Sequence, residues 1–255
     1  MAFRRSHQLY GIALLAVIVV PSSQSQDQWT WPEKPKNLQV LNKDWSGSRL
    51  SPIMRGFTRS LGVRCTHCHV GEEGKPLTSY DFVSDANPNK DRAREMLRML
   101  GSVNDHLKKI KPSGDKPVNM WCHTCHRGRP RPLTLGEELG EQYRAKGIDA
   151  ALEHYADLKL RFASRGAYDF GERSLNDLGF ELLEKGDAPA AIKIFKLNTD
   201  EFPKSANTWD SLAEGYMKAG DIKLATQYYE KVLELDPKSE NAKEKLKTLK
   251  ESSKK

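Results

Sequence analysis

Cysteine is scarce in this chain of 255 residues: there are four, and all of them lie in two short motifs. No cysteine therefore remains for a site elsewhere in the chain. Long apolar runs are also missing, because the run Leu9–Val20 has 12 residues and a helix that crosses a bilayer needs about 20. The sequence contains no nucleic-acid-binding motif, so we expect no nucleic-acid partner. No cluster of acidic and basic residues near the two motifs indicates a catalytic centre.

The N-terminus has the features of an export signal. Arg4 and Arg5 precede the apolar run, and small and polar residues follow it. Ser23 and Ser25 satisfy a small-x-small cleavage site, so we expect a signal peptide over residues 1–25. The absence of a cysteine after the run argues against a lipid anchor, and an uncleaved membrane anchor is the alternative. We expect a periplasmic or extracellular protein, with peripheral attachment to the membrane left open.

The four cysteines belong to two copies of a Cys-x-x-Cys-His motif, Cys65–His69 and Cys122–His126. Cysteines at positions i and i+3 lie about one helical turn apart, so both thiols can bond to the vinyl groups of one porphyrin. The histidine that follows can ligate the haem iron. The sequence therefore predicts two covalently bound c-type haems, attached through Cys65, Cys68, Cys122 and Cys125.

Other uses of these cysteines fit the sequence less well. Paired zinc knuckles are usually about 15–20 residues apart, whereas 53 residues separate Cys68 from Cys122. A thioredoxin-like motif would need a βαβ context, which this region lacks. Disulfides are compatible with export but give no role to a histidine after each second cysteine.

A helix is expected ahead of each motif. The first should cover residues 51–61, with Ser51 as N-cap, Pro52 at the first helical position and Gly62 at the end. The second should cover residues 90–110 and end at Lys111-Pro112. Each helix has a methionine on its apolar stripe, Met54 in the first and Met96 near the centre of the second, while Met99 lies about 60° off that stripe.

The runs Met54–His69, Ala93–Met99 and Cys122–Gly128 resemble the cytochrome c subunit of photosynthetic reaction centres, over about residues 36–135. In that family each haem is held by a helix with an axial methionine, a turn and the attachment motif. The family's full subunit holds four haems, whereas this chain has motifs for two. The resemblance therefore implies a dihaem relative of that fold and not a photosynthetic role.

The resemblance also implies the iron ligands. His69 and His126 become the proximal ligands and Met54 and Met96 the distal ones, with Met99 and His106 as runners-up. Ordinary core packing is the alternative role for either methionine. Arg127 and Arg129, which follow the second motif, could pair with haem propionates, and a solvated basic linker is an equal alternative.

The segment 172–237 repeats its pattern after 34 residues. Apolar and turn residues recur at matching positions: Gly186 and Gly220, Asp187 and Asp221, Leu178 and Leu212, Ala191 and Ala225, Phe195 and Tyr229, and Pro203 and Pro237. In this part the chain resembles the tetratricopeptide repeat (TPR) family, whose helix pairs stack into a solenoid. A degenerate earlier copy is expected at Leu139, Tyr143, Gly147, Ala151 and Tyr155, and a polar capping helix over residues 239–250.

The predicted fold is thus all-α. It consists of a small cytochrome domain of helix-loop-CxxCH units, residues 26–135, followed by TPR-like repeats, residues 136–255. Residues 26–135 hold 19 Lys and Arg against 11 Asp and Glu, a net charge of +8, and residues 136–255 hold 20 against 23, a net charge of −3. A basic surface around a haem edge commonly steers an acidic redox partner.

We therefore expect an electron carrier rather than an enzyme, which docks a redox partner through its basic haem face and its repeats. If the haem domain of one copy binds the repeats of the next, a homo-oligomer or filament results. The alternatives are a peroxidase-like haem enzyme with one open iron site and a scaffold protein whose haems are structural.

Overall fold

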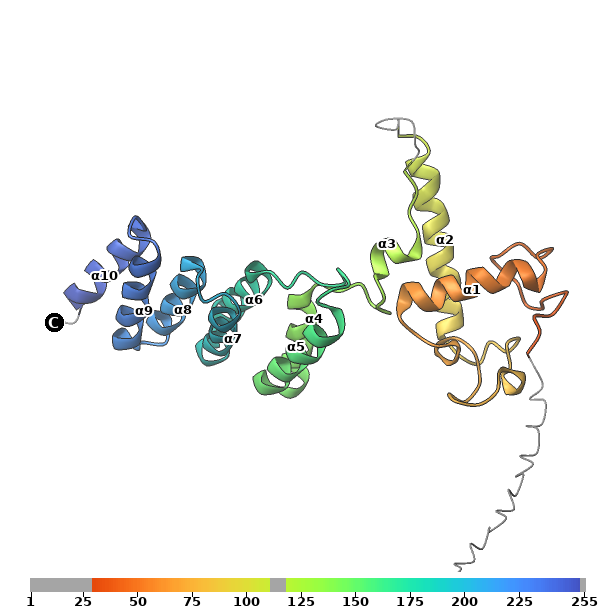
Figure 1. Ribbon diagram of the computed structural model, residues 1–255, viewed down its shortest axis with the longest axis horizontal. Coiled ribbons are helices and arrows are strands. Elements are labelled where there is room, and N and C mark those ends of the chain that lie inside the picture. Colours follow the sequence, from red (N-terminus) through yellow and green to blue (C-terminus); the bar gives the residue numbers. More distant parts are fainter. Residues whose placement is uncertain (1–28, 111–117, 253–255) are drawn as a thin grey trace, which may run out of the picture.

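A computed structural model of the chain describes residues 29–110 and 118–252; the predicted signal peptide, residues 1–25, lies outside them. The described residues form ten α-helices and two short 3-10 turns and contain no β-strand, which confirms the all-α prediction. The molecule is elongated, with α1–α3 at one end and the stacked helices α4–α10 at the other (Figure 1). No helix within residues 29–110 and 118–252 is long and apolar enough to span a membrane.

The first helix starts earlier than the sequence predicted. Helix α1 covers Gly47–Leu61, and its N-cap is Ser46, whose hydroxyl accepts a hydrogen bond from the Arg49 N–H. Pro52 therefore lies inside the helix and not at its first position. Proline is tolerated there because Pro52 and Ser48, whose carbonyl loses its partner, are both exposed.

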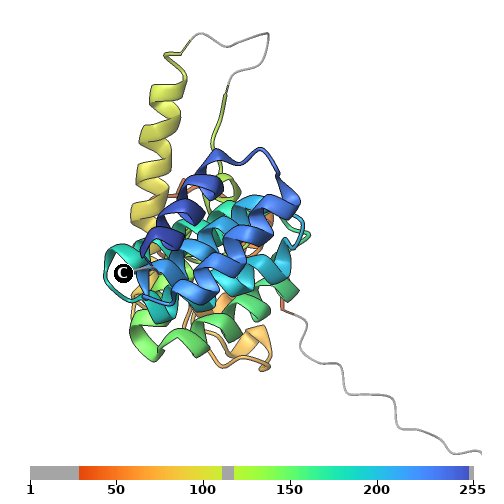
Figure 2. The same ribbon diagram turned by 90° about the vertical axis from the view of Figure 1, so that its left-hand side faces the viewer.

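The second helix, α2, covers Asn89–Leu107 and so ends three residues before the predicted end at residue 110. In Figure 2 this helix stands apart from the stacked helices of the other half. An acidic side chain fixes its first turns: Asp85 pairs with Arg94 at 2.8 Å and accepts a hydrogen bond from the Asn37 side chain at 2.8 Å. These contacts, Arg94 first, lower the pKa of Asp85 to about 2. The extended segment before α1 is thereby tied to α2.

The second half is a stack of helix pairs. The helices are α4 (Leu135–Lys146), α5 (Ile148–Phe162), α6 (Glu172–Glu184), α7 (Ala188–Glu201), α8 (Ala206–Lys218), α9 (Ile222–Leu235) and α10 (Glu240–Ser252). Helices α8 and α9 begin 34 residues after α6 and α7, which is the period that the sequence predicted. The first helix of the stack begins at Leu135, one residue before the predicted boundary at 136, because Thr134 is its N-cap.

The hydrophobic core lies in this stack. The core contains three residues of the predicted early copy, Leu139, Ala151 and Tyr155, together with Phe195 and Tyr229 of the regular repeats. In residues 29–110 and 118–134, by contrast, Leu50 is the one apolar side chain that is fully buried. The two halves of the chain are therefore stabilised differently.

Candidate functional site

The first Cys-x-x-Cys-His motif forms a tight turn that is held by the start of α2. The 3-10 turn η1 covers Cys65–His67, and the His69 N–H donates to the Cys65 carbonyl at 2.9 Å. The side-chain amides of Asn87 and Asn89 donate to the carbonyls of Thr66 (3.2 Å) and His67 (2.9 Å). The backbone of the motif is thereby fixed to the N-terminal end of α2.

The imidazole of His69 is poised to act as a ligand. Its Nδ1 is buried and has no hydrogen-bond partner, and its ring meets Phe82 edge-on at 5.0 Å. Burial, and secondarily the charge of Lys90, lower the pKa of His69 to about 4. The ring is therefore neutral at pH 7, which is the form that ligates metals. A buried ring nitrogen without a partner fits an iron ligand.

The second motif is the short helix α3, Cys122–His126, and it is held by the other end of α2. The Asn104 side chain accepts a hydrogen bond from the Met120 N–H at 2.8 Å and donates to the Met120 carbonyl at 3.0 Å. One asparagine thus fixes the backbone two residues before Cys122. Helix α2 therefore carries a motif at each end.

The imidazole of His126 has a partner that sets its tautomer. Its Nδ1 lies 2.9 Å from the Arg129 carbonyl, which can only accept a hydrogen bond. The proton therefore sits on Nδ1, and the lone pair of Nε2 is left for a metal. An imidazole whose Nδ1–H donates to a backbone carbonyl is the usual arrangement of a metal-bound histidine.

The two motifs also meet through the C-terminal end of α1. The Gly128 N–H, two residues after the second motif, donates to the Ser60 carbonyl at 2.8 Å. Gly62 ends α1 with φ of 68°, and a Cβ there would lie 2.0 Å from the Gly128 carbonyl oxygen. Only glycine fits this approach, because it tolerates both the positive φ and the close carbonyl.

The methionines predicted as distal ligands lie on α1 and α2. Met54 is half-buried, whereas Met96 and Met99 are 47% and 54% exposed. His106, the other runner-up, is exposed on the last turn of α2. Exposure thus does not separate Met96 from Met99. The apolar stripe of α2 is only partly buried, and the flat apolar face of a porphyrin would fit against it.

The two arginines after the second motif point toward the repeats. Arg129 is 7% exposed, and its guanidinium donates to the Leu133 carbonyl and stacks on the Tyr168 ring at 3.9 Å from its centroid. Its Nε is buried without a partner. Arg127 donates to the Gly166 carbonyl at 3.2 Å. Both line a cavity of about 690 Å³ that also reaches Cys125.

The chemistry of the donor set fits covalent haem. All four cysteines are free thiols, and burial raises the pKa of Cys68 and Cys122. Each motif supplies two thiols and one imidazole in a single turn. In the part of the chain that the structure describes, no three His, Cys, Asp or Glu side chains gather as a metal site.

Sequence reasoning missed the residues that hold the motifs in place. Asn89 and Asn104 had no recognisable pattern, because an amide that bonds a distant backbone group leaves no local signal. The stacking of Arg129 on Tyr168 joins residues 39 positions apart and also could not be predicted from the sequence. The true start of α1 did have a signal, since Ser46 is as good an N-cap residue as Ser51.

Two family models match this chain. The family model described as "Photosynthetic reaction centre cytochrome C subunit" matches residues 22–165, and the tetratricopeptide repeat model matches residues 206–239. The first match extends beyond the two motifs and includes α4 and α5. A cytochrome c family implies covalently bound haem.

Two curated proteins illustrate the likeness. Cytochrome c-554 of Chloroflexus aurantiacus is 31% identical over 107 residues, which are 42% of this chain and 23% of that protein. The photosynthetic reaction center cytochrome c subunit of Rubrivivax gelatinosus is 29% identical over 101 residues, 36% of this chain and 25% of that protein. The chain thus matches about a quarter of the length of these relatives.

Among solved structures, the first TPR of Spaghetti (RPAP3) bound to an HSP90 peptide is similar to 48% of this chain and 91% of its own. The identity is 15% and the TM-score 0.34.

Proposed function

Because the chain belongs to the photosynthetic reaction centre cytochrome c subunit family, we propose that it is an exported electron carrier with two covalent c-type haems. The repeats hold a partner protein beside the haem domain while electrons cross. The protein works in the periplasm or outside the cell. It is not an enzyme, because the proposed histidine and methionine ligands leave neither iron with an open position.

One observation supports two haems more than any other: helix α2 holds a Cys-x-x-Cys-His motif at each end. Asn89 fixes the first motif and Asn104 the second. A single rigid element thus sets the spacing of the two motifs, as a protein that passes electrons between two centres requires. The apolar stripe between these asparagines offers each porphyrin a surface on which to pack.

Each residue of the site has a distinct task. The thiols of Cys65 and Cys68 hold one porphyrin, and those of Cys122 and Cys125 hold the other. His69 and His126 ligate the two irons, the latter through Nε2 because the Arg129 carbonyl keeps the proton on Nδ1. A bound haem supplies an iron that gains and loses one electron.

The distal ligands come from Met54 and Met96, whose thioethers raise the haem potential relative to histidine. Among the arginines, Arg127 is the better placed to meet a propionate of the second haem, because its side chain is exposed. Arg129 reaches the same propionate with its unpaired Nε, while its Nη1 donates a hydrogen bond to the Leu133 carbonyl.

The proposal is tested by the mass and the redox titration of the mature protein. The intact mass should exceed that of the polypeptide by two haems, and a titration followed by optical and EPR spectra should resolve two low-spin centres. Cys65→Ala and Cys122→Ala should each weaken or abolish covalent attachment at one site and leave the other intact. A mass without haem, or a high-spin centre that binds peroxide, would contradict the proposal.

A further inference from the structure

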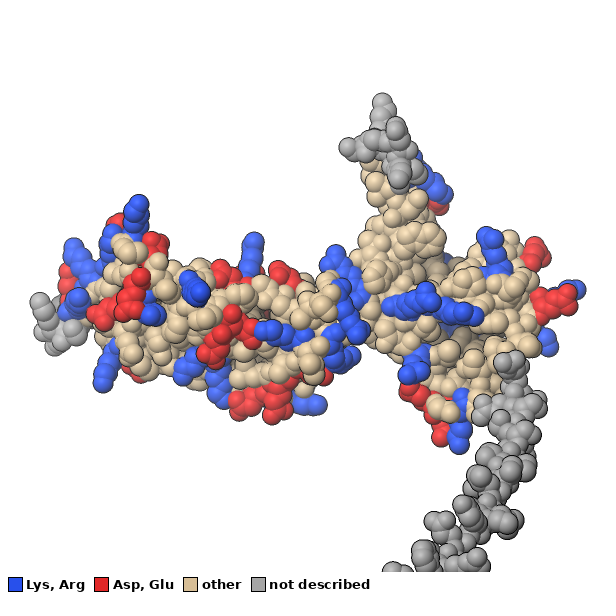
Figure 3. Space-filling model, in the orientation of Figure 1, with Lys and Arg blue, Asp and Glu red and all other residues tan. Residues whose placement is uncertain are grey.

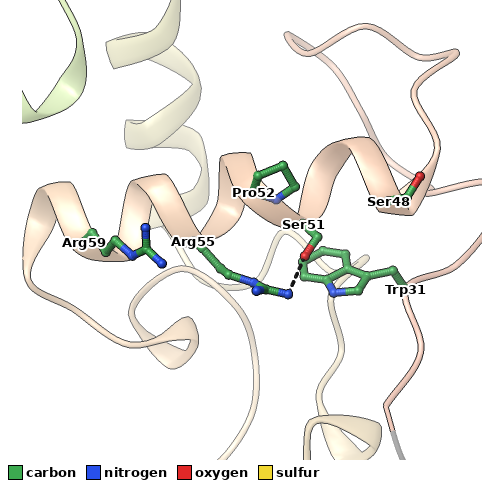
Figure 4. Close-up of a pocket in the computed structure, with 6 residues that line it drawn as sticks. All are labelled: Trp31, Ser48, Ser51, Pro52, Arg55 and Arg59. Carbon is green, nitrogen blue, oxygen red and sulfur yellow. Dashed lines mark hydrogen bonds between the residues drawn. The ribbon is translucent and has the colours of Figure 1, made fainter.

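A cleft of about 480 Å³ lies between the extended N-terminal segment and α1. It is lined by Trp31, Ser48, Ser51, Pro52, Arg55 and Arg59. Figure 4 shows the two guanidinium groups on the same side of the helix, with the indole of Trp31 beside Ser51. The two arginines are four residues apart, so their side chains lie one above the other on the helix surface.

The walls of the cleft are held in place by specific contacts. The Gly47 N–H donates to the Pro32 carbonyl at 3.0 Å, and a Cβ at Gly47 would lie 2.7 Å from the Cβ of Trp31. The missing side chain therefore lets Trp31 sit directly against α1. The Ser51 hydroxyl, on a residue that is 7% exposed, accepts a hydrogen bond from Arg55 Nη2 at 2.8 Å. This bond orients Arg55 along the cleft.

The charge of the cleft is uncompensated. Residues 45–71 contain four arginines and no aspartate or glutamate. Arg64 pairs with Glu73 at 2.9 Å, whereas Arg55 and Arg59 have no ion pair with any residue that the structure describes. Basic side chains gather over α1 on the face shown in Figure 3, and the acidic ones lie toward the margins of this half.

A line of touching aromatic rings joins the cleft to the first iron ligand. The centroid of Trp31 lies 6.3 Å from that of Trp29, which lies 4.7 Å from that of Phe82. Phe82 in turn meets the His69 ring at 5.0 Å. A partner seated on Trp31 is therefore connected to the first haem site by a series of ring contacts.

We propose that this cleft is the docking site for an acidic surface of the redox partner, with a carboxylate of that partner between Arg55 and Arg59. The inference rests on the proposed electron-transfer function and adds the place and the chemistry of the contact. Guanidinium groups bind carboxylates in a bidentate manner. A positive cleft also accelerates the approach of an anionic partner, and salt weakens this effect.

The test uses the full-length, haem-loaded protein with a reduced acidic ferredoxin as the electron donor. Each ferredoxin passes one electron to one oxidised iron of the protein, and stopped-flow absorbance gives the rate. R55E/R59E should slow this reaction at low salt by at least about tenfold and remove most of its salt dependence. The control K75E/K109E makes the same change of charge, from +2 to −2, at two exposed lysines of the haem domain whose side chains form no hydrogen bond or ion pair with any described residue. It should change the rate by less than about twofold.

Three further results would overturn the inference. A shift in either haem potential in R55E/R59E would mean that the arginines contact a haem and not a partner. If R55E/R59E reacts with ferredoxin as fast as the wild type but is oxidised more slowly by ferricyanide, the cleft is a site for small anions only. Dimerisation of the wild-type protein that R55E/R59E abolishes would make a second copy the occupant.

A folding defect can be separated from these results. The Arg59 side chain has no hydrogen bond with any described residue, so R59E alone replaces the double variant if the latter is poor in haem. A wild-type protein without haem would instead contradict the proposed function and leave no electron transfer to measure.

Discussion

A few single hydrogen bonds decide what the side chains of this site can do. The Nδ1 of His126 bonds a backbone carbonyl, whereas that of His69 is buried without a partner. The imidazoles of His69 and His126 are therefore held differently. If both ligate haem iron as proposed, the imidazole with the Nδ1–H bond should be the more basic ligand, and the two haems should differ in potential.

The choice between Met96 and Met99 can be settled by matched substitutions. Met96→His should lower the potential of one haem and remove part of the sulfur-to-iron absorption, because histidine replaces a thioether that favours the reduced iron. The effect should be a sizeable part of the roughly 0.8 V range that axial ligands span. Met99→His should leave both potentials nearly unchanged. Spectroelectrochemistry of both variants gives the answer, and the reverse pattern would make Met99 the ligand.

Helix α2 is the element that organises the haem half. Its sequence is amphipathic, yet its apolar stripe is not covered by other helices, and the contacts that fix it come from asparagines at its two ends. A helix with this pattern is stable in the fold only if something large and apolar packs on the stripe. Two haems bound as proposed at the attachment motifs would lie where their porphyrins could do so.

Asn104 should therefore matter for one haem and not for the other. Asn104→Ala removes two part-buried hydrogen bonds to Met120, worth about 1 kcal/mol each, and frees the segment before Cys122. We expect a loss of about 2 kcal/mol in the free energy of unfolding and poorer attachment at the second motif. Chemical denaturation and intact mass measure the two effects. Asn119→Ala, at an exposed neighbouring position, is the control, and equal loss at both motifs would contradict the role of Asn104.

The molecule as a whole consists of two halves: residues 29–110 and 118–134, which have no large protein core, and the helices α4–α10, which have one. The junction is short, because α4 begins nine residues after His126. Arg129 links the halves directly: its carbonyl bonds His126 and its guanidinium stacks on Tyr168. A partner bound to the first repeats would therefore lie beside the second haem site.

Removal of the repeats should leave the haems and their potentials unchanged but slow electron exchange with the partner. A chain that ends at Leu133 should keep both haems and similar potentials, because all predicted ligands precede that residue. Its electron exchange with the physiological partner should slow by about tenfold or more, since the local concentration that the repeats provide is lost. Stopped-flow kinetics with both chains test this. Equal rates would exclude a docking role, and a haem-poor shortened chain would indicate that the repeats stabilise the haem half.

The sequence by itself determined the features that depend on short spacings. Two Cys-x-x-Cys-His motifs, a glycine at the end of α1 and a 34-residue period each involve residues within a turn or a repeat, and their chemistry is local. The all-α class and the TPR stack followed from them. The true start of α1 did not, because Ser46 and Ser51 are equivalent N-caps and only packing chooses between them.

Tertiary structure decided everything that depends on residues far apart in the chain. Three such features have no local signature in the sequence: the links from α2 to both motifs, the stacking of Arg129 on Tyr168, and the cleft formed by Trp31, Arg55 and Arg59. They arise because folding brings together backbone groups and side chains that no spacing rule connects. The sequence thus specified which chemical groups are present, and the fold specified which of them meet.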